Sequence, residues 1–239
     1  MVQTVARDRM GAERAKKWVE TAVDFLADTY NFDQHDMNTW AACSQLMPHL
    51  SVATELADEL AHLTNQVAYL NNEAGFYLQY YGDLAGARPY YERALAIDEK
   101  VLQPDHPDTA IDLNNLGMLL QAMGDLAGAK PYYERALAIK EQVLGAEHPA
   151  TAISQDNLGG LLQEMGNFEQ AKKHREQALI VFEKVLGKEH PTVATSLNNL
   201  GGPAASIWAT WRKRSHISSE RWRLMRRHWG QTTLIRPWT

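Results

Sequence analysis

The fold is decided by the stretch GDLAGARPYYERALAI at residues 82–97. Nearly the same letters, GDLAGAKPYYERALAI, return at residues 124–139, and GNFEQAKKHREQALIV follows at residues 166–181. Each step is 42 residues long. A fixed period of this length is typical of a chain built from stacked structural units, each a single supersecondary motif. The same step also separates three dipeptides: His106-Pro107, His148-Pro149 and His190-Pro191.

Each unit is predicted to form two helices. In the second unit, Leu113, Leu116 and Leu120 fall at steps of three and four residues, which places them on one face of a helix. Gly124-Asp125 then interrupts the helical pattern, and a second amphipathic run follows up to Gly145. Two helices this short cannot bury their apolar faces alone, so neighbouring units must stack. The sequence therefore predicts an all-α fold, an α-α superhelix.

These residues resemble a known family. Leu116-Gly117, Leu120, Ala129, Tyr133 and Ala136 are similar to the tetratricopeptide signature. The NNLG of residues 114–117, the LGAEHP of residues 144–149 and the 42-residue period resemble the kinesin light chain type of this repeat. The resemblance implies a tetratricopeptide solenoid over residues 66–202, divided into units 66–108, 109–150 and 151–192 and a partial unit 193–202. Glu141 stands where the family usually ends its second helix with a proline, so we expect a longer second helix.

Residues 1–65 form an N-terminal helical segment without the repeat. We expect one helix over residues 12–30, with Trp18, Ala22, Phe25 and Leu26 on one face, and a second amphipathic run over residues 39–63 that is broken near Pro48. With the LNNEAG of residues 70–75, this segment resembles the junction between a winged helix and the repeats in bacterial NB-ARC-type signalling ATPases. That resemblance implies a sensor arm detached from its ATPase, because the phosphate-binding GxxxxGK[ST] loop is absent from this chain.

The tail at residues 203–239 departs from the pattern. It carries eight basic residues and one acid, a net charge of +7. Because the whole chain has a net charge of −5, the other residues together carry −12. Five of the seven tryptophans also lie there. If the gene is read in a frame that starts at the third base of each codon, the tail can encode another copy of the repeat. Because tryptophan has a single codon, the shifted frame must encode glycine directly after Trp208 and Trp229, where the repeat has glycine. We therefore interpret the aberrant basic, Trp-rich tail as a frameshifted repeat; the rival hypothesis is a patch that binds nucleic acid or membrane.

Composition argues against several function classes. The chain is 45% hydrophobic and 22% charged, which is ordinary for a soluble globular protein. Cys43 is the single cysteine, and no apolar run reaches the roughly 18 residues that a membrane span needs. We expect a cytoplasmic protein with no membrane or nucleic-acid partner. The three histidines of the His-Pro dipeptides lie about 10 Å apart or more in a stack, too far to share a metal ion. No catalytic pattern stands out, so we predict no enzymatic activity, no metal and no cofactor.

Asparagines in the first helix of each unit are the best binding candidates. One column of the repeat holds Asn72, Asn114, Asp156 and Asn198, and the next holds Glu73, Asn115, Asn157 and Asn199. Asparagine is a mediocre helix former, and its amide offers both a donor and an acceptor. Either these amides bind the main chain of an extended peptide, or they bond neighbouring helices and hold the solenoid together. In the tetratricopeptide family this part of the first helix lines a concave groove. The resemblance implies a peptide-binding groove formed by Tyr69, Asn72, Phe76, Gln79, Ile111, Asn114, Asn115, Met118, Gln121, Ile153, Asn157, Gln163, Asn198 and Asn199.

The expected partner is a protein or an extended peptide segment. The family's carboxylate clamp for chaperone tails needs Lys or Arg on the first helices, and residues 67–80, 109–122 and 151–164 contain neither. The chain is thus expected to be a peptide-binding scaffold, either the detached sensor arm or a stand-alone adaptor of the kinesin light chain type. A non-functional gene remnant is the third reading. Loss of the pattern after residue 202 leaves the last unit uncapped, which predicts self-association through the C-terminal end.

Overall fold

A computed structural model describes residues 11–200, and this range contains nine α-helices and no strand. The predicted all-α class is therefore confirmed. The tail at residues 203–239, with the frameshift hypothesis, lies outside the described residues. The helices are α2 (Ala12–Thr29), α3 (Met37–Glu59), α4 (Asn65–Tyr80), α5 (Leu84–Val101), α6 (Pro107–Ala122), α7 (Leu126–Leu144), α8 (Pro149–Glu164), α9 (Phe168–Leu186) and α10 (Pro191–Leu200).

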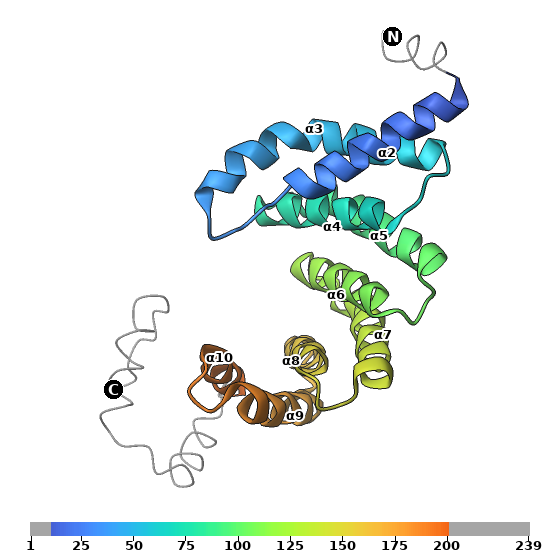
Figure 1. Ribbon diagram of the computed structural model, residues 1–239. Helices are drawn as coiled ribbons and strands as arrows, with labels where there is room; N and C mark the ends of the chain where they lie inside the picture. Colours follow the sequence, from blue (N-terminus) through green and yellow to red (C-terminus); the bar gives the residue numbers. More distant parts are fainter. Residues whose placement is uncertain (1–10, 201–239) are drawn as a thin grey trace.

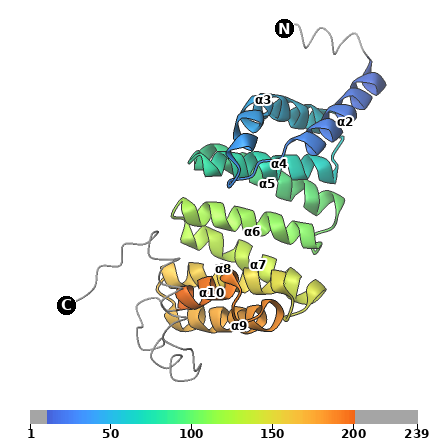
Figure 2. The same cartoon turned by 60° about the vertical axis from the view of Figure 1, so that its left-hand side comes forward.

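The repeats form hairpins that stack into a curved array. Helices α4 and α5, α6 and α7, and α8 and α9 pair, and each outer helix also contacts the first helix of the next pair. Figure 1 shows α4, α6, α8 and α10 on the inside of the curve and α5, α7 and α9 on the outside, and Figure 2 shows the same order from another side. Helix α7 continues past Glu141 to Leu144, which confirms the longer second helix.

A glycine and an aspartate make the turn inside the first two hairpins. Gly124 has a φ of +83°, a conformation that side chains rarely adopt, and it follows the last turn of α6. Asp125 then caps α7, because its Oδ1 accepts a hydrogen bond of 2.8 Å from the backbone N–H of Gly128. Gly82 and Asp83 repeat this geometry before α5. The turn chemistry read from the sequence therefore sets the hairpin geometry.

Small residues let the two helices of a hairpin approach closely. A β-carbon placed on Gly117 of α6 would lie 3.2 Å from the ring of Tyr133 on α7. That ring is almost wholly buried, and its hydroxyl donates to Oε1 of Gln121 at 2.9 Å. The first hairpin repeats the arrangement, with Tyr91 against Gly75. The third replaces the tyrosine with Arg175, which keeps the bond to the equivalent glutamine, Gln163.

Histidines begin the first helix of each later unit. The Nδ1 atoms of His106, His148 and His190 each accept a hydrogen bond, at 3.1–3.2 Å, from the backbone N–H two residues later. This bond caps the helix and requires an unprotonated Nδ1. Each histidine therefore ends a turn and starts the first helix of the next unit. Within residues 11–200, no group of three metal-binding side chains comes together.

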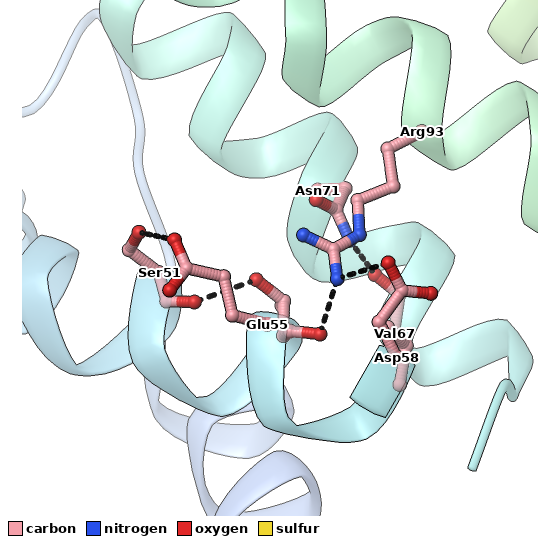
Figure 3. A network of polar contacts seen from close by, with 7 residues as sticks. Ser51, Glu55, Asp58, Val67, Asn71 and Arg93 are labelled. Atoms are coloured by element: carbon pink, nitrogen blue, oxygen red, sulfur yellow. Dashed lines mark hydrogen bonds and ion pairs between the residues drawn. The ribbon is translucent and has the colours of Figure 1, made fainter. Parts of the chain in front are cut away.

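The N-terminal helices continue the stack. Arg93 on α5 donates to the backbone oxygen of Thr54 on α3 and pairs with Asp58, both at 2.7 Å (Figure 3). Arg135, 42 residues later on α7, makes the equivalent ion pair with Glu99 on α5. Helix α3 therefore occupies the place of an outer helix, and α2 and α3 together cover the first repeat. One apolar core joins them to α4.

Two expectations for this segment are wrong. Helix α3 runs without a break through Pro48, which is exposed, so water can hydrogen-bond the carbonyl that loses its N–H partner. On α2, Trp18 and Phe25 are 66% and 61% exposed. The residues that α2 and its C-cap bury are Ala15, Val19, Val23, Leu26 and Tyr30. The apolar face read from the sequence is therefore not the face that packs, since Leu26 is the one large residue of it that is buried.

Candidate peptide-binding face

Three rows of side chains run along the inner helices, one residue per unit. The first row is apolar although exposed, since Tyr69, Ile111 and Ile153 are 44%, 48% and 49% exposed. The second row is Glu73, Asn115, Asn157 and Asn199, and the third begins with Phe76, which is half-buried, and Met118, which is 43% exposed. A polar row between two partly exposed apolar rows is a surface with the chemistry to bind an extended chain.

The asparagines form a ladder between units. Asn115 Nδ2 donates to Oδ1 of Asn72 at 3.2 Å, and Asn157 donates to Asn114 at 2.9 Å. Asn199 donates in the same way to Asp156 at 3.1 Å. Each bond joins one inner helix to the next. The amides therefore bond neighbouring helices, as the second reading of the sequence expected.

The ladder leaves part of its hydrogen-bonding capacity open. Asn72 uses both ends of its amide, because it also donates to Asp112. Asn115 and Asn157 donate only, and their Oδ1 atoms accept nothing from the described residues. Asn198 is exposed and makes no hydrogen bond within the same part of the chain. The ladder thus holds the units together while presenting free acceptors along the inner face.

The three predicted glutamines lie at the edge of this face and serve the hairpins. Gln79 and Gln121 accept from Tyr91 and Tyr133, and Gln163 accepts from Arg175. Gln121 also donates to Glu164 of the next unit at 2.7 Å. All three amides therefore bond within their own units, and that of Gln121 also joins two units.

Two buried carboxyl groups meet behind the ladder, and the sequence did not single them out. Asp98 on α5 is 5% exposed and Asp112 on α6 is 1% exposed. Burial raises the pKa of Asp112 to about 8; the bond from Asn72 opposes the rise, and the charge of Asp98 adds to it. Burial also raises the pKa of Asp98. With both ionised, Asp98 Oδ1 and Asp112 Oδ2 would have no donor among the described residues, whereas a proton on Asp112 supplies one.

Glu73 is a third site residue absent from the predicted groove. Burial raises its pKa to about 7. It occupies the column in which the later units carry asparagine. The change from asparagine to glutamate was the feature of the sequence that could have identified it as a site residue. Within the described chain it forms no hydrogen bond or ion pair.

The geometry defines a class: a solenoid of helical hairpins with a continuous inner face. The sequence matches the tetratricopeptide repeat family over residues 66–142, 113–179 and 151–202, which together cover more than half of its 239 residues. The chain belongs to the tetratricopeptide repeat family. A search of curated proteins finds no match.

Solved structures share the fold. A Podosopora anserina kinesin light chain protein with nearly identical tetratricopeptide-like repeats superposes with a TM-score of 0.51 at 24% identity, over 67% of this chain and 81% of that chain. BtubC (BKLC) from P. vanneervenii superposes with a TM-score of 0.59 at 19% identity, over 97% of this chain and 95% of that chain. The likeness to BtubC extends over the N-terminal helices as well as the repeats.

Proposed function

We propose that the protein is a non-enzymatic scaffold that binds a protein or an extended peptide along the inner face. The observation that carries the proposal is the exposed apolar row of Tyr69, Ile111 and Ile153 beside the asparagine ladder. Free Oδ1 atoms on Asn115 and Asn157 would accept backbone N–H groups of the bound chain. Membership in a family of protein-binding repeats supports the same function.

The experiment compares two exposed β-branched residues on opposite layers. The full chain is tested on an array of immobilised peptides, and hits are titrated by fluorescence anisotropy. Ile111→Lys changes the inner face, and Val143→Lys changes outer helix α7, where the side chain is 48% exposed. We expect Ile111→Lys to weaken binding at least about tenfold, since it places an unpaired charge in an apolar contact, and Val143→Lys to leave it unchanged. Equal effects, or no binding to any peptide, would remove the proposal.

The biological setting proposed for this face is the sensor arm of an NB-ARC-like signalling protein, separated from its ATPase and acting in the cytoplasm. The resemblance of residues 1–75 to the junction in such ATPases supports it. The similarity to kinesin light chain repeats favours a second candidate, a stand-alone adaptor. Sequencing the surrounding locus tests both, because an ATPase reading frame directly upstream is expected only for the sensor arm. A locus interrupted in every reading frame would instead indicate a gene remnant.

We also propose that the protein self-associates through its C-terminal end. Helix α9 carries Phe168, Ile180 and Val185 with half or more of their surface exposed. Light scattering over a hundredfold range of concentration is expected to show a rising mass. A constant monomer mass would refute this.

In the described residues, no helix is both long enough and apolar enough to span a membrane.

A further inference from the structure

The inner layer of the solenoid is acidic. Helices α4, α6, α8 and α10 contain no lysine or arginine. They contain five carboxylic residues: Glu73, Asp108, Asp112, Asp156 and Glu164. Asp156 is close to a cation from the outer layer, because Arg175 Nε of α9 lies 3.9 Å from its Oδ1. Because Asp112 keeps its proton up to a pH near 8 and Arg175 offsets Asp156, the negative charge of the inner layer comes from Glu73, Asp108 and Glu164. A concave surface with this charge attracts ligands of the opposite sign.

Glu73 stands out among these acids because it is half-buried and has no cation or hydrogen-bond donor within the described residues. Later units place asparagine in this column, where it donates to the residue 43 positions earlier. The residue 43 positions before Glu73 is Tyr30, just after the end of α2, which is 1% exposed and whose hydroxyl has no partner in the described chain. Burial and, to a lesser extent, the charge of Glu73 raise the pKa of Tyr30, of Cys43 on α3, of Tyr69 on its own helix and of Tyr91 on α5. None of these is a cation, so no cation among residues 11–200 offsets the charge of Glu73.

Two aromatic side chains flank this carboxyl group. Tyr69, Glu73 and Phe76 are spaced four and three residues apart on α4, which places them along one face of the helix. The ring of Phe76 is fixed by Phe32, with centroids 5.6 Å apart. An aromatic face attracts a cation, and a carboxylate adds a charge-assisted hydrogen bond.

We propose that Tyr69, Glu73 and Phe76 bind a lysine or arginine side chain of the ligand, so that the inner face selects basic extended peptides. This inference rests on the proposed function. Neighbouring inner helices lie about 10 Å apart, close to the length of three residues of an extended polyproline II chain at about 3.1 Å each, and such a chain has three residues per turn. A peptide with its cations facing the polar row would therefore present a second line of side chains, also at every third position, to Ile111 and Ile153.

The probes are three fluorescent synthetic peptides of about a dozen residues, enough to span the three units. They repeat Lys-Leu-Thr, Gln-Leu-Thr or Glu-Leu-Thr. The full-length chain is titrated with each by anisotropy at pH 8 and pH 5.5. Glu73→Gln removes the charge, and Glu169→Gln removes one from an exposed position on outer helix α9 as the control.

The lysine peptide is expected to bind at least about tenfold more tightly than the glutamine peptide, and the glutamate peptide to bind weakest. Glu73→Gln should abolish the preference for lysine over glutamine, whereas Glu169→Gln keeps it. The preference should shrink at pH 5.5, where Glu73 is protonated, and at high salt. Glu73→Gln should also raise the melting temperature at pH 8, because it removes a desolvated charge. Weaker binding by a more stable variant is a result that a purely structural role for Glu73 does not produce.

The outcomes separate this inference from the proposed function. If the lysine and glutamine peptides bind equally and Ile111→Lys weakens both, the peptide-binding face stands and the inference fails. If the lysine preference survives Glu73→Gln, the assignment to this residue is wrong. If none of the peptides binds, both proposals fall.

Discussion

Replacing Asp112 by asparagine tests the buried carboxyl pair between the first two repeats. In the folded chain Asp112 keeps its proton up to a pH near 8, whereas an aspartate in an unfolded chain loses it near 3.9. Between these values the folded state binds one proton more than the unfolded state. The free energy of unfolding therefore falls as pH rises, by about 1.4 kcal/mol for each pH unit. Asparagine resembles the protonated acid, because it still accepts from Asn72 and can donate to Asp98, and it does not titrate.

From pH 5 to pH 7, the stability of Asp112→Asn relative to the wild type should increase by about 3 kcal/mol, or about 6–12 °C in melting temperature. The assay is thermal and urea unfolding followed by far-ultraviolet circular dichroism at pH 5, 6 and 7. Asp105→Asn is the control, because Asp105 is an exposed residue of the preceding loop. Its stability relative to the wild type should be nearly the same at each pH. A pH-independent difference between Asp112→Asn and the wild type would refute the reasoning, since it would mean that the folded state holds no extra proton there.

Three further substitutions test the stacking. Gln103 has a φ of +93° at the position where the next unit has Gly145. Gln103→Gly should therefore stabilise the protein by about 1 kcal/mol, seen as a higher melting temperature. An unchanged melting temperature would mean that the loop carries no strain. Asn72→Ala removes two hydrogen bonds between repeats and should lower the free energy of unfolding by about 1–3 kcal/mol, measured by urea unfolding. An unchanged urea midpoint would show that the ladder contributes nothing to stability. Gly117→Val forces a branched side chain against Tyr133 and should cost about 1–3 kcal/mol, whereas a stable variant would contradict the tight packing.

Several features of the site could not be predicted because they depend on which residues meet across units. The asparagine columns were visible, but their pairing joins residues 43 positions apart, one more than the period, and only stacking brings these together. The pairing of Asp98 with Asp112 likewise crosses from one hairpin to the next. The exposure of Trp18 depends on which face of α2 meets α3 and α4, because both faces of that helix carry apolar residues.

The sequence by itself determined that the structural unit is a helical hairpin and that several such hairpins follow one another. Helical periodicity, a glycine at the turn inside each hairpin and a proline at the start of each later unit are local signals, and repetition at 42 residues showed that the hairpins follow one another along one stack. Only the tertiary structure decided what the polar residues do. Side chains such as Asn72 and Asp112 acquire their hydrogen bonds and proton affinities from neighbours about forty residues away. Burial and partner geometry, which set those properties, exist only once the hairpins have stacked.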